Sequence, residues 1–218
     1  MIDELIRSKR KTLAVVVNGQ GKVIVRAPLT ASQKSIEDFV KKHEGWIAKK
    51  KSVALACKVQ LPTDNLHGYN VLLLGKYYQT VVYSQDRVAL DIQNNRLYIP
   101  EKNAQKRLTL WIKENALRIV KQSVEEQSLR MGVTANSISI TGAKSFWGIC
   151  TGKNDLRFCY RVLYAPKDVL EYVVVHELAH IKHKNHSIAF WREVEQYIPN
   201  WKEKRRWLKQ HSALMQVF

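Results

Sequence analysis

The chain has 218 residues, of which 45% are apolar and 25% are charged, as is ordinary for a folded globular protein. No segment approaches the roughly 18 consecutive apolar residues of a membrane-spanning helix, so we expect a protein that does not cross a membrane. The net charge of +17 favours an anionic partner, with nucleic acid as the first candidate, although a solvated basic surface explains it equally well.

The N-terminus and the cysteines predict a cytoplasmic protein. Acidic residues come early, at Asp3 and Glu4, and the apolar run that follows is too short for the core of a secretory signal. Cys57, Cys150 and Cys159 are too few, and odd in number, for an exported protein held together by disulfides.

The first hundred residues predict a twisted antiparallel sheet with one helix. Two β-branched runs flank Asn18-Gly19, which is a strong hairpin signal. Apolar residues at helical spacing come next, and Thr30 or Ser32 can cap the first turn of that helix. The predicted segments are a hairpin over 12–28, a helix over 30–52, and hairpins over 69–84 and 88–100.

The remaining residues predict helices around a short sheet. A long helix over 103–130 is followed by Met131-Gly132, which is a typical helix stop. Strands are expected over 137–142 and 156–166, the second with an amphipathic face and one open edge. We therefore expect an α+β fold, with a β-rich accessory region of residues 1–102 before a small domain of residues 103–218.

A buried helix is predicted from Val169 to about His183, because the segment is apolar on nearly every side. Pro166 suits its first turn, and Asp168 is favourable at its positive end. The helix nevertheless carries two histidines and a glutamate, which are costly to bury unless something pairs with them.

The polar residues of this helix form the pattern His-Glu-x-x-His. His176 and His180 are four residues apart, so their imidazoles lie on one helix face and can bind one Zn²⁺. Glu177 is rotated by about 100° from His176 and can reach a metal-bound water without binding the ion. The pattern is typical of zinc peptidases, and it predicts two metal ligands and a catalytic base.

A catalytic zinc needs a third protein ligand, for which His183 and His186 compete. Three ligands on one straight helix cannot surround an ion tetrahedrally, which disfavours His183. Asn185 tolerates the left-handed conformation that ends a helix, and Ser187 can cap the next one, so the reversal would return His186 to the metal. We favour His186, with His183 beside the ligands, facing substrate or solvated.

The segment "YVVVHELAHIKHKNHSIAFWREVEQYIPNWKEKRRWLK" resembles the YgjP-like metallopeptidase family, which is related to the SprT and Spartan zinc proteases. The upstream segments "LGKYYQTVV" and "FWGIC" also fall where the family has similar ones. The resemblance implies a zincin-like domain over 103–218, one Zn²⁺ held by His176, His180 and His186, and Glu177 as the base.

One segment departs from the family pattern. The family has Arg-Trp-Gly-Ser-Cys where this chain has "FWGIC", so Phe146 and Ile149 replace two polar residues that could orient a substrate. The departure bears on substrate specificity and leaves the metal pattern intact.

These features predict a zinc metalloendopeptidase that hydrolyses peptide bonds with a metal-activated water. Tyr160, Arg161 and His183 are candidates for contacting the oxyanion or the substrate. We expect an extended peptide or protein substrate to add along the sheet edge near residues 156–164.

Two alternatives remain open. The first is a zinc-stabilised binding protein with little turnover. The second is weak nucleic-acid association through the basic surface, in which Trp201 and Trp207 would stack on bases. We favour packing of both tryptophans on the core, with the neighbouring cations solvated.

Overall fold

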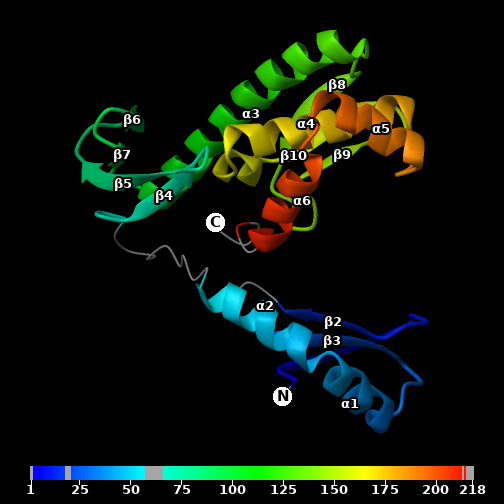
Figure 1. The fold of residues 1–218 in the computed structure, drawn as a ribbon. Helices are drawn as coiled ribbons and strands as arrows, with labels where there is room; N and C mark the ends of the chain where they lie inside the picture. The colour runs from blue at the N-terminus through cyan, green and yellow to red at the C-terminus, as the bar shows by residue number, and fades with distance from the viewer. Residues whose placement is uncertain (1, 18–20, 57–65, 213, 215–218) are drawn as a thin grey trace. The chain divides into compact units, whose positions relative to one another are not determined.

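The computed structural model describes residues 2–17, 21–56, 66–212 and 214 (Figure 1). The chain divides into two compact units, one ending at Gln60 and the other beginning at Leu61. The predicted boundary after residue 102 lies inside the second unit, and the division into an accessory region and a peptidase domain stays a prediction. The α+β fold class is confirmed by the elements described below.

The first unit is a three-stranded sheet with two helices. The predicted hairpin is confirmed as an antiparallel pair, and its turn at 18–20 lies outside the described residues. A further strand pairs in parallel with the second arm of this hairpin and was not predicted, because all five of its residues are exposed and show no buried alternation. The elements are β1 (Glu4–Ser8), β2 (Ala14–Val17), β3 (Val23–Pro28), α1 (Gln33–Lys42) and α2 (Glu44–Ala56), with sheet order β1-β3-β2.

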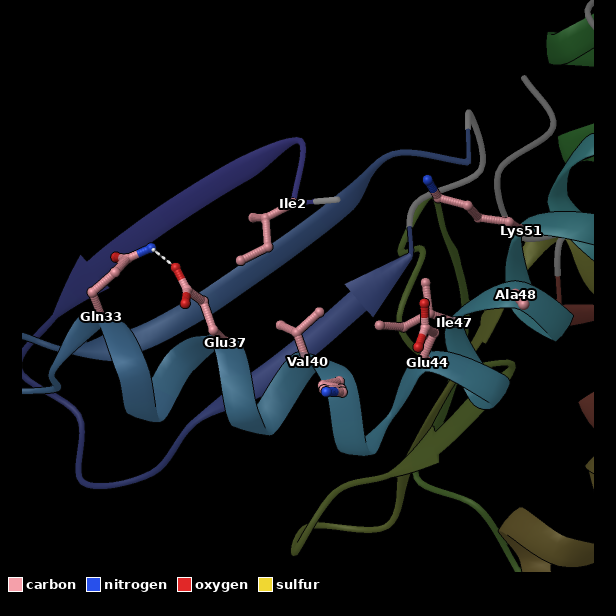
Figure 2. A pocket seen from close by; sticks show the side chains of 9 residues that line it. Ile2, Gln33, Glu37, Val40, Glu44, Ile47, Ala48 and Lys51 are labelled. Atoms are coloured by element: carbon pink, nitrogen blue, oxygen red, sulfur yellow. Dashed lines mark hydrogen bonds between the residues drawn. The ribbon is translucent and has the colours of Figure 1, made fainter.

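The single helix predicted over 30–52 is wrong, because it breaks at His43. Ser32 caps α1 by accepting the Ser35 N–H at 3.2 Å, as predicted. The His43 ring bonds to the Phe39 carbonyl at 2.7 Å, and the helix restarts at Glu44. Ile36 in α1 and Ile47 in α2 both pack against β3, so the apolar residues that predicted one helix face the same strand from two helices. Figure 2 shows the groove beside these helices, with Gln33 bonded to Glu37 along α1.

The second unit begins with a four-stranded sheet. Both hairpins predicted here are confirmed, and each is antiparallel. They join through a parallel pairing of β5 with β7, so the prediction of one antiparallel sheet over the first hundred residues is wrong. The strands are β4 (Asn70–Leu73), β5 (Lys76–Tyr83), β6 (Ala89–Asp91) and β7 (Arg96–Pro100), in the order β4-β5-β7-β6.

A long helix and a second sheet follow. Helix α3 (Ala104–Met131) ends at Gly132, whose φ of 61° is left-handed, as the sequence predicted. The sheet contains β8 (Ser137–Thr141), β9 (Gly148–Cys150) and β10 (Asp155–Cys159), in the order β8-β10-β9.

The strand predicted over 156–166 is correct only as far as Cys159. Residues Tyr160–Tyr164 form a 3-10 helix, η1, in which every side chain is buried. The carbonyls of Leu163 and Tyr164 accept the N–H groups of Leu74 and Gly75, so η1 is tied to the four-stranded sheet. The expected amphipathic face therefore does not continue past Cys159.

Three C-terminal helices complete the second unit: α4 (Lys167–Lys182), α5 (Ile188–Tyr197) and α6 (Trp201–Gln210). Helix α4 is the buried helix that the sequence predicted, and it packs against α3, β9, α5 and α6 (Figure 1). None of the helices in the described residues has the length and apolarity needed to cross a membrane.

The burial of α4 leads to a stability prediction. Leu170 in α4 is 1% exposed, whereas Leu129 in α3 is 81% exposed. We expect Leu170→Ala to lower the free energy of unfolding by about 2–5 kcal/mol, because it leaves a cavity in the core. The matched Leu129→Ala should change it by less than about 0.5 kcal/mol. Urea denaturation measures both, and equal losses would contradict the central role of α4 in the core.

Candidate metal centre

Three histidine side chains meet at the C-terminal half of α4. His176 and His180 come from successive turns of the helix, and His186 from the turn between α4 and α5. One ring nitrogen of each lies within 4.8 Å of the other two, and the Nε2 atoms of His176 and His186 are 3.0 Å apart. Nitrogens about 3.3 Å apart fit one tetrahedral zinc ion with bonds of about 2.0 Å. The histidine cluster therefore has the size of a metal site.

The chain reverses after α4 as predicted, but for a different reason. His183 ends the helix in an extended conformation, with φ −126° and ψ 100°. Asn185 is not left-handed, so that part of the prediction is wrong. Ser187 does cap α5, where its Oγ accepts the Phe190 N–H at 3.3 Å. The reversal places His186 beside the two helical histidines.

The His183 backbone also orients one of the candidate ligands. The Nδ1–H of His180 donates to the His183 carbonyl at 2.9 Å, which leaves Nε2 as the nitrogen with a free lone pair. The His183 side chain is half-buried. The contact that the structure shows is thus made by the main chain of His183.

The charge state of the histidines suits a metal. Burial, together with the neighbouring His180, His186 and Arg205, lowers the pKa of His176 to about 3. Burial also lowers the pKa of His180. Both rings are therefore neutral near pH 7, and neutral imidazole is the form that binds metal ions. The donor set fits a divalent transition metal such as zinc.

Glu177 lies next to the cluster and is 5% exposed. Its carboxylate accepts the backbone N–H of Cys150 in β9, while burial raises its pKa to about 8. A buried carboxylate with so few partners is costly to maintain, and such costs are typical of functional sites.

The strand nearest to Glu177 is β9, and β9 is an edge of its sheet. The predicted substrate edge near residues 156–164 is wrong, because β10 lies between β8 and β9 and both of its sides are paired. Residues 160–164 form η1 and offer no strand edge.

Tyr160 and Arg161 are buried in η1, at 3% and 2% exposure. The Arg161 guanidinium donates to the Gly142 carbonyl at 3.1 Å and lies 4.3 Å from the centre of the Tyr160 ring. These contacts give both side chains partners within the fold, and their contact with substrate stays a prediction.

Aromatic side chains from α5 pack against the histidines, and Trp201 of α6 packs against one of these aromatic rings; we did not predict this role for them. The Phe190 ring centre lies 4.5–4.9 Å from the centres of all three histidine rings. Trp191 stacks on His186 at 5.6 Å and on Trp201 at 4.1 Å. Phe190 and Trp191 follow the Ser187 cap within the first turn of the next helix, and this position in the sequence could have indicated that they lie near His186.

The two C-terminal tryptophans pack on the core, as we favoured from the sequence. Trp201 is 8% exposed, and Trp207 is partly buried against the same cluster. The Arg205 guanidinium carbon lies 5.3 Å from the centre of the Trp191 ring, which places a cation beside the aromatic layer.

Ile149, one of the two departures from the family pattern, faces away from Glu177. Successive side chains of a strand point to opposite faces, and a Cβ on Gly148 would meet the Glu177 side chain. Ile149 is 42% exposed and pairs with Arg157 of β10. This substitution therefore leaves the face next to the histidines unchanged.

Comparison with known proteins found a matching family and similar solved structures. The YgjP-like metallopeptidase domain matches residues 11–211. The chain is also similar to the crystal structures of two metallopeptidase zymogens, Pyrococcus abyssi abylysin (28% identity, TM-score 0.39) and Methanocaldococcus jannaschii jannalysin (25% identity, TM-score 0.38). Each similarity covers 42% of this chain, and 93% and 95% of those two chains respectively. No curated protein matches. Because the family match covers nearly the whole sequence, this chain belongs to the YgjP-like metallopeptidase family.

Proposed function

We propose that this metallopeptidase hydrolyses peptide bonds with one zinc ion held by His176, His180 and His186, and with Glu177 as the general base. The observation that carries the proposal is the meeting of three imidazoles beside a buried carboxylate. A zinc ion held there would act as a Lewis acid that lowers the pKa of a water molecule towards neutrality.

Glu177 is suited to move the proton. Its carboxylate is held by the Cys150 N–H and shielded from solvent, and burial gives it a higher proton affinity than an exposed glutamate. We propose that it takes a proton from the attacking water and passes it to the leaving amine. The His183 carbonyl binds the Nδ1–H of His180, so Nε2 is the nitrogen that would bind the ion.

The proposed substrate is an extended peptide or protein segment. The edge strand β9 borders Glu177, so a peptide that lies along this edge would bring a carbonyl group close to the histidines. Nucleic-acid binding by tryptophan stacking is not part of the proposal, because Trp201 is buried and already stacked on Trp191. Cytoplasmic location and cleavage within the chain rather than at its ends stay predictions.

The role of Glu177 is tested by Glu177→Gln. We expect the variant to keep its zinc and lose about 10²–10⁴-fold in kcat, because glutamine cannot accept the proton. Turnover of a fluorogenic peptide library and metal content measure the two effects. Glu195→Gln, which changes an exposed glutamate on α5, is the matched control and should be fully active. Undiminished proteolysis by Glu177→Gln would refute the mechanism and favour a different base.

The third ligand is tested by comparing His186→Ala with His183→Ala. We expect His186→Ala to lose most of its zinc on dialysis, because it removes a ligand. His183→Ala should retain about one zinc ion per chain, since the contact with His180 is made by the backbone carbonyl, which alanine keeps. The opposite pattern of metal contents would make His183 the ligand.

A further inference from the structure

Strand β9 approaches the Glu177 side chain unusually closely at Gly148. A Cβ atom built on Gly148 would lie 2.7 Å from Cγ, 2.8 Å from Oε1 and 3.0 Å from Cδ of Glu177. Carbon atoms in proteins do not pack this closely, so a side chain at residue 148 would have to displace the glutamate. The three nearest atoms all belong to Glu177, and the histidines are not among them.

We propose that Gly148 is a positioning residue, whose missing side chain leaves the space in which the Glu177 carboxylate is held for catalysis. The proposal rests on the proposed role of Glu177 as the general base and names the part of the fold that orients it. In this proposal the missing side chain at Gly148 acts on the reaction only through Glu177, and Gly148 holds no metal.

The backbone conformation does not require glycine at this position. Gly148 belongs to a strand, pairs with Phe158, and is not among the glycines with a positive φ. Alanine would fit the backbone of an ordinary strand. The need for glycine therefore comes from the space that the neighbouring glutamate occupies.

The strand cannot easily move away to admit a side chain. Cys159 donates to the Trp147 carbonyl at 2.8 Å, and Thr151 donates to the Asp155 carbonyl at 2.9 Å, so bonds to β10 hold β9 at both ends. In an antiparallel pair, alternate residues turn their backbone groups away from the partner strand. Cys150 is such a residue, and its N–H donates to the Glu177 carboxylate instead.

Strand β9 thus contributes twice to the position of one side chain. The Cys150 N–H interacts with the carboxylate, and the absence of a side chain at Gly148 leaves the space that the carboxylate occupies. Because the strand is fixed and Glu177 is buried, an added methyl group would rotate the glutamate out of this position and break its hydrogen bond to Cys150. General-base catalysis requires hydrogen-bond contact with the reacting water, so kcat should fall.

The activity test compares Gly148→Ala with Gly152→Ala. Gly152 follows β9 in the same hairpin, and a Cβ there meets nothing within 4 Å, so it is a matched control. We expect Gly148→Ala to lower kcat by at least about tenfold, with KM and zinc content within about twofold of the unmodified protein. Gly152→Ala should leave all three values unchanged.

A stability measurement separates positioning of Glu177 from general damage to the fold. Gly148→Ala should lower the thermal unfolding midpoint by about 3–6 °C when Glu177 is present. In a Glu177→Ala background, where the clashing atoms are gone, the same substitution should leave the midpoint unchanged or raise it. An equal decrease in both backgrounds would overturn the inference.

The two proposals can fail separately. Full activity of Gly148→Ala, with Glu177→Gln inactive, would overturn the positioning role and leave the proposed function standing. Full activity of Glu177→Gln would overturn the proposed function whatever Gly148→Ala does. We expect both Gly148→Ala and Glu177→Gln to lower kcat. We also expect the effect of Gly148→Ala on the unfolding midpoint to depend on whether Glu177 is present.

Discussion

The structure around the candidate metal centre depends on the burial of one helix, α4, which carries ionisable side chains into the core. Most residues of this helix are inaccessible to solvent, including the glutamate of the His-Glu-x-x-His pattern. Burial removes the water that would otherwise solvate charge, so it lowers the pKa of His176 and His180 and raises the pKa of Glu177. Both changes suit these side chains to bind a metal and to accept a proton.

The elements next to α4 determine how the histidine side chains are arranged. An extended residue at the end of α4 and the cap of α5 bring His186 back over the helix, and the His183 carbonyl orients His180. Phe190 and Trp191 then pack against the imidazoles, and Trp201 packs behind Trp191. Aromatic packing limits the orientations of the rings, so the positions of the candidate ligands are largely set by the fold.

Strand β9 borders the site at Glu177. Its outward-facing N–H at Cys150 and the bare position at Gly148 both act on Glu177, whereas Ile149 lies on the other face of the sheet. The alternation of a strand explains how one of two departures from the family pattern can sit beside the site without entering it. Gly148 of the short segment "FWGIC" lies against Glu177, which comes nearly thirty residues later in the sequence.

The sequence by itself determined the local features of this protein. Helical spacing, the Gly132 stop, the Ser187 cap and the antiparallel pairing of the hairpins were predictable, because each depends on residues close together in the sequence. The pairing of β1 with β3 and of β5 with β7, the change from strand to 3-10 helix after Cys159, and the edge position of β9 were not. These features were decided by the tertiary structure, because they depend on contacts between segments far apart in the chain. The same reason explains why the pattern on α4 pointed to the candidate metal ligands, while the surroundings of Glu177 became apparent only when β9 was seen to lie against it.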